Sequence, residues 1–315
     1  MNENDSSAPN QTIINTLVAA GTALILLAVG TVFFISSVRS TPVQADSVSD
    51  STTSSDPLID GQAASDPVGL LAEAENLVFV LADDLDWNLF NQVPRLAALK
   101  EQGITFTNHT VTDSLCCPSR VSIMRGQYIH NHKVISNIEK TGGGWPTFRD
   151  RKEENDCLPV WLSNAGVTTA LFGKYLNDFP SEPKEAKYIP PGWDQWAVPI
   201  SRGDSYTGYN YTLNDNGTLV RYGNKTSDFL NDVITNKATQ FIQTAQQPFF
   251  LELSTYSPHK PAPVATRNAL KQGGTLAPRN PTYNSYGVDE PKWMKDKTPL
   301  NAARLAKADR QWRQR

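Results

Sequence analysis

The residues best suited to chemistry form the run Cys116-Cys117-Pro118-Ser119-Arg120. Pro118 is typical of the first turn of a helix, so Cys116 is expected just before a helix N-terminus, where backbone N–H groups and the helix dipole favour anions. Arg120 is always charged and fork-shaped, and it could hold a sulfate or phosphate or orient the side chain at position 116. A pair of structural cysteines at a helix cap explains the residue types equally well.

A second group consists of Asp83, Asp84 and Asp86, which directly follow the apolar run 76–82. Adjacent carboxylates repel each other unless a positive charge lies between them, and calcium and magnesium prefer oxygen ligands of this kind. These residues therefore indicate a divalent metal site. A solvated turn before a helix is the simpler interpretation of an isolated Asp-Asp pair, so the metal hypothesis depends on the other motifs nearby.

Short apolar runs alternate with helical patterns, and these elements must position both groups. Continuous apolar runs predict buried strands, whereas a proline in the first turn or apolar residues at a 3.6 spacing predict helices. The alternation favours an α/β fold with a mainly parallel sheet covered on both faces, in which ligands bind at the carboxyl ends of the strands. The predicted strands are 76–82, 104–108, 167–172 and 249–253, and the predicted helices are 94–100, 159–164 and a segment capped by Ser227 that reaches Ile242.

The composition limits the class of protein. The 315 residues are 39% hydrophobic and 19% charged, which is typical of a globular chain rather than a disordered one. A net charge of -3 gives no electrostatic basis for a nucleic-acid partner. Three cysteines, two of them adjacent, cannot form a disulfide framework. The compartment therefore has to be inferred from targeting signals.

The N-terminal part predicts a membrane anchor. Residues 12–38, after a short flank at 1–11, carry no charged side chain and exceed the roughly 20 residues that a spanning helix needs. The Ser- and Asp-rich residues 39–75 predict a linker. A signal peptide cleaved after Ala45 is the alternative, and it would give a secreted form. Arg39 alone would keep the bulk of the chain cytoplasmic, but the catalytic interpretation below favours an extracytoplasmic domain.

Other side chains have simpler explanations than a site. His130 and His132 have the i, i+2 spacing of some metal ligands, but no partnering Cys or His cluster follows. We therefore reject zinc and expect substrate-side or surface histidines. Trp145, Trp193 and Trp196 could stack on sugar faces, although tryptophans in a large domain more often belong to the core or its rim.

The run around Cys116 resembles the sulfatase signature. The family pattern Cys-x-Pro-Ser-Arg, five variable residues and Gly matches from Cys116 to Gly126, with Met124-Arg125 where the family often has Leu-Thr. The resemblance extends from Asn76 to the end of the chain. It is closest to the N-acetylglucosamine-6-sulfatases, and extracellular heparan endosulfatases and some arylsulfatases share its features. The segments that carry it are SLCCPSR, GQYIHNHKVISN, FGKYLN, PPGWDQW, YNYTLNDNG and APRNPTYN.

This resemblance implies an alkaline-phosphatase-like sulfatase fold and a sulfuric ester hydrolase acting on a sulfated glycan or an aryl sulfate. In the family, a formylglycine-generating enzyme oxidises the first signature cysteine, so Cys116 would become Cα-formylglycine and supply the nucleophile. Asp83 and Asp84 would hold calcium, or alternatively magnesium. The other implied roles are Arg120 orienting the nucleophile, Lys174 and His259 contacting the sulfate, His259 protonating the departing oxygen, and Asn177 binding substrate.

The resemblance also predicts a missing part. In the family an Asp-Asn pair beyond the motif around His259 completes the metal site, and no such segment follows before Arg315. We therefore expect residues 76–315 to be a partial catalytic domain, and the isolated chain to be poorly folded and inactive. The alternatives to a glucosamine-6-sulfatase are an arylsulfatase, a formylglycine-dependent phosphodiesterase, and an inactive remnant that binds sulfated glycans.

Overall fold

Within the part of the chain that the structure describes, nine strands form one central sheet. The computed structural model describes residues 22–28, 31–35, 76–200, 203–268, 274, 276–280, 283–285, 289, 291–292 and 297–314. The strands follow the order β4-β2-β1-β3-β9-β5-β6-β7-β8. Their bounds are β1 Thr22–Ala28, β2 Thr31–Ile35, β3 Asn76–Asp83, β4 Ile104–Phe106, β5 Thr168–Gly173, β6 Gln195–Pro199, β7 Thr212–Asp215, β8 Thr218–Arg221 and β9 Phe249–Pro258.

The middle of the sheet is parallel. β3 pairs in parallel with β1 and β9, and β5 pairs in parallel with β9 and β6. The pairs β1/β2, β2/β4, β6/β7 and β7/β8 are antiparallel. The α/β fold with a mainly parallel sheet, predicted from the alternating patterns, is thus confirmed. Because β3, β5 and β9 are neighbours that run in one direction, their carboxyl ends meet at one edge.

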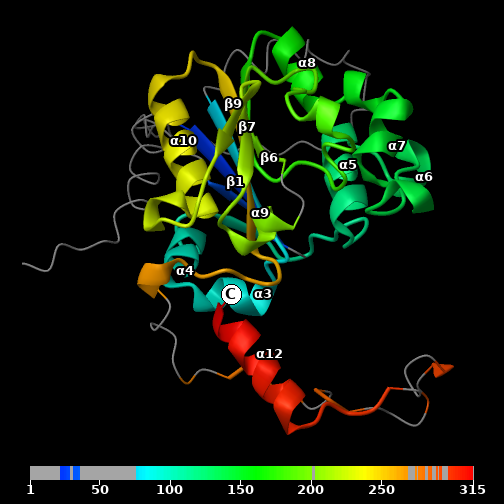
Figure 1. The fold of residues 1–315 in the computed structure, drawn as a ribbon, viewed down its shortest axis with the longest axis vertical. Coiled ribbons are helices and arrows are strands. Elements are labelled where there is room, and N and C mark those ends of the chain that lie inside the picture. The colour runs from blue at the N-terminus through cyan, green and yellow to red at the C-terminus, as the bar shows by residue number, and fades with distance from the viewer. Residues whose placement is uncertain are drawn as a thin grey trace, which may run out of the picture.

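Helices cover both faces of the sheet (Figure 1), and each face has its own apolar core. One core joins α10 to the odd-numbered positions of β9, such as Leu251 and Leu253. The other joins α5 and α7 to the even-numbered position Phe250, as the alternation of side chains along a strand requires. The helices are α3 Trp87–Gln92, α4 Pro94–Lys100, α5 Cys116–Arg125, α6 Ile129–His132, α7 Gly144–Asp150, α8 Leu158–Asn164, α9 Asp204–Thr207, α10 Leu230–Thr244 and α12 Ala302–Gln314.

Most predicted elements form within a few residues of the expected bounds. The largest difference is β9, which continues to Pro258 instead of ending at Leu253, because the polar residues beyond Leu253 still pair with β3. Ser227 does not cap α10; it lies in a 3-10 turn, Thr226–Asp228, and α10 begins after Phe229. The N–H of Leu230, the first residue of α10, instead donates a hydrogen bond to the Gly208 carbonyl at 2.9 Å.

The structure has strands, and not the expected membrane helix, in the described part of residues 12–38. Thr22–Ala28 and Thr31–Ile35 form the antiparallel strands β1 and β2, and β1 adds in parallel to β3. A continuous apolar run suits a buried strand as well as a helix, so hydrophobicity alone does not separate the two. Among the described residues, no helix has both the length and the apolarity to cross a membrane. The linker 39–75 and the cleavage site after Ala45 lie outside the described residues.

Candidate functional site

Three predicted groups converge at the carboxyl edge of β3, β5 and β9. Asp83 is the last residue of β3 and is in register with Pro258, the last residue of β9. Lys174 follows the end of β5, and His259 follows the end of β9. The shared direction of these three strands therefore brings together side chains that are distant in sequence.

The centre of the site is a buried charge cluster. Lys174 Nζ lies 2.7 Å from Asp83 Oδ2, and their side chains are 3% and 5% exposed. Arg120 lies 3.7 Å from the other oxygen of Asp83. Arg120 Nη1 also donates hydrogen bonds to the Lys174 carbonyl at 3.0 Å and to Ser254 Oγ at 2.5 Å. The predicted residues Asp83, Arg120 and Lys174 thus belong to one network.

The charge state of Lys174 follows from these neighbours. Burial and the nearby Arg120 lower its pKa, but Asp83 and the Cys116 side chain raise it, and the net pKa is above the ordinary lysine value. Lys174 therefore carries a full positive charge at neutral pH. With Arg120, it gives this pocket edge the two cations that an anionic group such as sulfate requires.

Gly173 permits the close approach of β5 to β9 that places Lys174. Its φ is 113°, a conformation that only glycine adopts readily, and a Cβ atom there would lie 1.8 Å from the Ser254 carbonyl oxygen. The same carbonyl accepts a hydrogen bond from the Lys174 N–H at 2.8 Å. The backbone at Gly173 thus turns directly against β9 and directs the next side chain towards Asp83.

Cys116 is the first residue of α5, so the predicted position at a helix N-terminus is confirmed. Asn137 Oδ1 accepts a hydrogen bond from the Cys117 N–H at 2.8 Å and fixes this turn. The pKa of the Cys116 thiol is raised, chiefly by burial and partly by Asp83, although Lys174 opposes this effect. The unmodified side chain is thus a neutral thiol at pH 7 and lacks the lowered pKa of a reactive thiolate.

His259 and Asp84 form the more exposed rim. His259 Nε2 lies 3.7 Å from Asp84 Oδ2, with the side chains 27% and 40% exposed. His259 Nδ1 lies 2.5 Å from the Lys260 carbonyl oxygen, so this ring nitrogen carries the proton and donates it. Nε2 is then left facing the site, where it can accept or, in the imidazolium form, donate a proton.

Tyr206 belongs to the site but was missed in the sequence. It lies on the short helix α9, and its ring centroid is 4.7 Å from that of His259 and 5.3 Å from Lys174 Nζ. The insertion between β6 and β7 brings it there from outside the strands that carry the other groups. No motif around position 206 distinguishes it from an ordinary tyrosine, so only the tertiary structure reveals the contact.

Asn177 contacts the core behind α5. Its carbonyl accepts a hydrogen bond from the Trp145 N–H at 2.7 Å, and its N–H lies against the Cys117 sulfur. Its side-chain oxygen is buried and has no hydrogen-bond partner within the described part of the chain. These contacts tie Asn177 to the core behind α5 rather than to the charge cluster.

The remaining sequence candidates are core or surface residues. His132 is fully buried and hydrogen-bonded to Ser122 and to the Val134 N–H, which corrects the expectation of a surface or substrate-side histidine. His130 is exposed and stacks on Tyr128. Trp145, Trp193 and Trp196 are 1%, 8% and 0% exposed, so they are core residues and not sugar platforms.

The donor set fits part of a calcium shell. Ligand atoms of Asp83, Cys116 and His259 lie within 4.8 Å of one another, and of these the Asp83 carboxylate is the oxygen ligand that calcium prefers. Asp83 and Asp84 offer the carboxylate oxygens that a hard cation prefers, whereas Asp86 is used otherwise, since it caps α3 through the Leu89 N–H at 3.0 Å. Calcium takes about six to eight oxygens, so these two carboxylates supply only part of its coordination.

Comparison with known proteins agrees with this geometry. A family model described as Sulfatase matches residues 75–287. The N-acetylglucosamine-6-sulfatase of Capra hircus is 33% identical over 249 residues, which cover 76% of this chain and 44% of that protein. An extracellular sulfatase SULF-1 homolog of Drosophila melanogaster is 31% identical over 228 residues, covering 70% of this chain and 20% of that protein. The chain thus spans less than half the length of these curated relatives.

A solved structure shares the fold. It is described as a complex of its protein with the substrate D-glucosamine-2-N,6-O-disulfate. The TM-score is 0.52 at 21% sequence identity, with 66% of this chain and 40% of that chain covered. At this identity the similarity concerns the arrangement of strands and helices, and the chemistry has to be argued from the side chains described above.

Proposed function

Because the chain belongs to the sulfatase family, we propose that it is part of a sulfuric ester hydrolase that removes sulfate from sulfated sugars of the glucosamine-6-sulfate type. The observation that carries this proposal is the position of Cys116 at the start of α5, with Lys174, Arg120 and Asp83 gathered beside it. The named relatives, an N-acetylglucosamine-6-sulfatase and an extracellular sulfatase, support the substrate class.

The nucleophile is proposed to arise by modification of Cys116. A neutral, half-buried thiol is a poor nucleophile, and its raised pKa argues against direct attack by a thiolate. Oxidation of Cys116 by a formylglycine-generating enzyme gives Cα-formylglycine, an aldehyde. Addition of water to the aldehyde gives a geminal diol, and one of its hydroxyl groups serves as the nucleophile in place of the thiol. Arg120, held by the Lys174 carbonyl and Ser254, orients the side chain at position 116.

The other residues bind the sulfate ester and move a proton. Lys174 and Arg120 bring two positive charges to the sulfate oxygens. His259 donates from Nδ1 to the Lys260 carbonyl, so a proton carried on Nε2 is free to pass to the oxygen of the departing alcohol. Asn177 is proposed to support the substrate-binding wall from the core side, through its backbone contacts with Trp145 and Cys117.

Asp83 and Asp84 are proposed to hold a divalent cation, calcium or alternatively magnesium. Such an ion neutralises charge on the sulfate and on the nucleophile. Lys174 occupies one carboxylate oxygen of Asp83. The groups left to the ion are therefore the second oxygen of Asp83 and the carboxylate of Asp84.

The catalytic domain is proposed to act outside the cytoplasm, where sulfated glycans occur, as the printed name of the Drosophila relative suggests for that protein. Since β1 and β2 take up part of residues 12–38, this proposal does not depend on an anchor in that segment. A reporter active only after export, fused to the C-terminus of the full-length protein, is expected to be active. A reporter active only in the cytoplasm would contradict the proposal.

The experiment that tests the function uses the natively expressed full-length protein. Mass spectrometry of the peptide that ends at Arg120 is expected to show formylglycine at position 116. Sulfate release is measured on glucosamine 6-sulfate, an aryl sulfate and, in parallel, a phosphate diester. Cys116→Ala should abolish release, whereas the matched Cys117→Ala should retain it. An unmodified Cys116 thiol with no sulfate release would overturn the proposal, and preference for the diester would point to a phosphodiesterase.

A further inference from the structure

Glu252 occupies an unusual position in the middle of β9. Its in-register neighbours are Phe79 on β3 and Leu171 on β5, and its side chain is 7% exposed. A carboxylate in such an apolar row is costly to bury unless it is paired, whereas a leucine or methionine would pack there without that cost. A conflict of this kind between residue type and environment is expected at functional sites.

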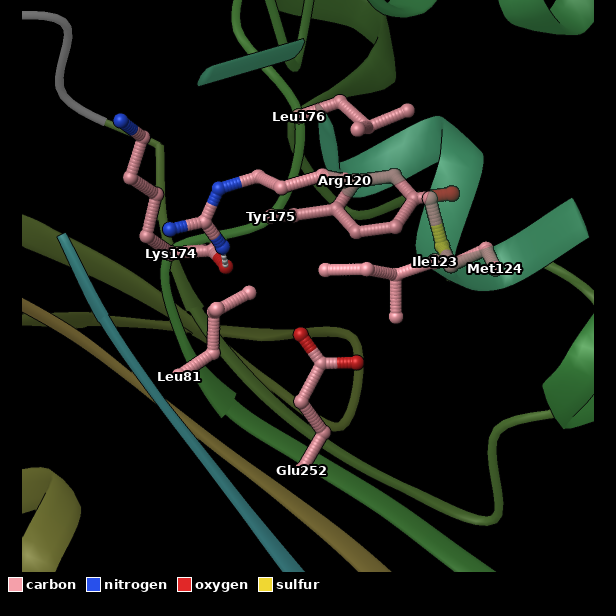
Figure 2. A pocket seen from close by; sticks show the side chains of 8 residues that line it. All are labelled: Leu81, Arg120, Ile123, Met124, Lys174, Tyr175, Leu176 and Glu252. Atoms are coloured by element: carbon pink, nitrogen blue, oxygen red, sulfur yellow. Dashed lines mark hydrogen bonds between the residues drawn. The ribbon is translucent and has the colours of Figure 1, made fainter. Parts of the chain in front are cut away.

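The carboxylate lies beneath Arg120. Glu252 and Ser254 are two positions apart, so they point to the same face of β9. Ser254 accepts a hydrogen bond from Arg120, and Glu252 lies one step further below the same guanidinium. The Arg120 and Glu252 side chains line one small cavity (Figure 2). Its volume is about 10 Å³, room for roughly one water molecule. Leu81 and Ile123 help to close it.

Few groups compensate the negative charge of an ionised Glu252. Its carboxylate forms none of the hydrogen bonds or ion pairs found in the described part of the chain. The groups that face it are Arg120 from α5, Lys174 and Tyr175 from the segment after β5, and the apolar Leu81 from β3. Burial raises the pKa of Glu252 to about 7, and Arg120 opposes this rise. The carboxyl group therefore changes its charge close to neutral pH.

Among the described residues, the anionic partner of Arg120 at the site edge is Asp83, and this contact is loose. The nearest oxygen of Asp83 is 3.7 Å away, and Lys174 occupies the other one at 2.7 Å. A sulfate ester that enters the site would pull the Arg120 guanidinium towards itself. A negative charge on the other side of the guanidinium would resist this displacement. Glu252 is a buried acid that lines the same cavity as Arg120, away from the site edge (Figure 2).

We propose that Glu252 is a positioning residue, whose ionised carboxylate holds Arg120 in the orientation that directs it to the side chain at position 116. The proposal rests on the proposed function, because orientation of the nucleophile by Arg120 is part of it. In the neutral form Glu252 no longer attracts the guanidinium. The fraction of correctly oriented Arg120 then falls as the pH decreases through the neutral range.

The test compares Glu252→Gln and Glu252→Met in the full-length protein with Leu251→Met, a change on the opposite face of β9. Sulfate release from glucosamine 6-sulfate is measured from pH 5 to 9. Both Glu252 variants are expected to lose about tenfold in kcat, with KM changed less than about twofold and an unchanged or higher Tm. They should also lose the rise in kcat near pH 7 that the wild type and Leu251→Met retain.

Two outcomes overturn the inference. One is that Glu252→Gln and Glu252→Met keep the wild-type kcat and pH profile. The other is that both lose activity only in proportion to a lowered Tm, which would make Glu252 a structural residue.

A separate measurement distinguishes failure of the proposed function from failure of the inference about Glu252. If the wild type releases no sulfate, stabilisation of the protein by inorganic sulfate is measured instead. A smaller sulfate-induced shift of Tm in Glu252→Gln than in the wild type, at pH 8, supports the positioning of Arg120. An equal shift in both proteins would refute it.

Discussion

Lys174 Nζ and Asp83 Oδ2 form a 2.7 Å ion pair between residues 91 positions apart, with both side chains almost fully enclosed. The pair joins the end of β5 to the end of β3 across β9. It keeps a cation and a carboxylate in place at the site edge before any substrate or metal arrives. Such preorganisation reduces the reorganisation that binding and catalysis would otherwise require.

Replacing Lys174 by methionine leaves Asp83 buried with Arg120, 3.7 Å away, as its remaining cation. We expect kcat/KM for sulfate release to fall by at least about 100-fold, because one of two cations facing the sulfate is lost. The free energy of unfolding should fall by about 3 kcal/mol, as when one partner of a buried pair is removed. Lys184→Met, an exposed control, should change neither quantity measurably. Wild-type activity in Lys174→Met would contradict the assigned role.

Gly173→Ala places a Cβ 1.8 Å from the Ser254 carbonyl and forces alanine into φ 113°. We expect a loss of more than about 3 kcal/mol in stability, measured by urea unfolding, together with loss of activity. The matched control is Gly166→Ala, where φ is also positive but a Cβ would meet no atom within 4 Å. That variant should lose only about 1 kcal/mol. Equal losses in the two variants would show that contact with β9 is not the cause.

Tyr206 is expected to act through its ring. Tyr206→Leu removes the aromatic contacts with His259 and Lys174 and should lower kcat/KM about fivefold. Tyr206→Phe keeps the ring and should stay within about twofold of the wild type. A large loss in the phenylalanine variant would instead indicate that the hydroxyl group contacts the substrate.

Stability should decrease in acid because of His132. Burial, with smaller contributions from Arg125 and Arg151, lowers its pKa from 6.5 to about 4. The unfolded chain then binds more protons between these values, so the stabilisation is complete above pH 6.5 and is lost as the pH falls towards 4. The loss amounts to about 3 kcal/mol.

The measurement for His132 is urea unfolding of the wild type at pH 7, 5.5 and 4.5. His132→Gln should show a smaller pH dependence than the wild type. His130→Gln, at an exposed position, should leave the pH dependence as it is. Identical profiles for the wild type and His132→Gln would refute the assignment.

The metal hypothesis is tested with Asp84. Chelation of divalent cations should abolish sulfate release in the full-length protein, and added calcium should restore it. Asp84→Asn should raise the calcium concentration for half-maximal activity about tenfold, because a charged ligand is lost. Asp86→Asn is the matched control, since asparagine can cap α3 as aspartate does. Activity that is unaffected by chelators would rule out the ion.

Much of the site could be predicted because its residues follow local rules. Pro118 in the first turn of α5 indicated where Cys116 would lie, and the end of an apolar run marked Asp83. Lys174 and His259 were expected from the family resemblance, and the structure brings them to Asp83 because the carboxyl ends of neighbouring parallel strands meet. The function of the signature residues came from resemblance and not from geometry.

The amino-acid sequence by itself determined the α/β class and the approximate positions of the main strands along the chain, since periodicity and turn residues are local properties. Only the tertiary structure decided that Tyr206 reaches His259, that His132 is buried, that Glu252 lies under Arg120 and that part of residues 12–38 forms strands. These outcomes depend on packing between segments distant in sequence, where burial and pairing outweigh what each residue type favours alone.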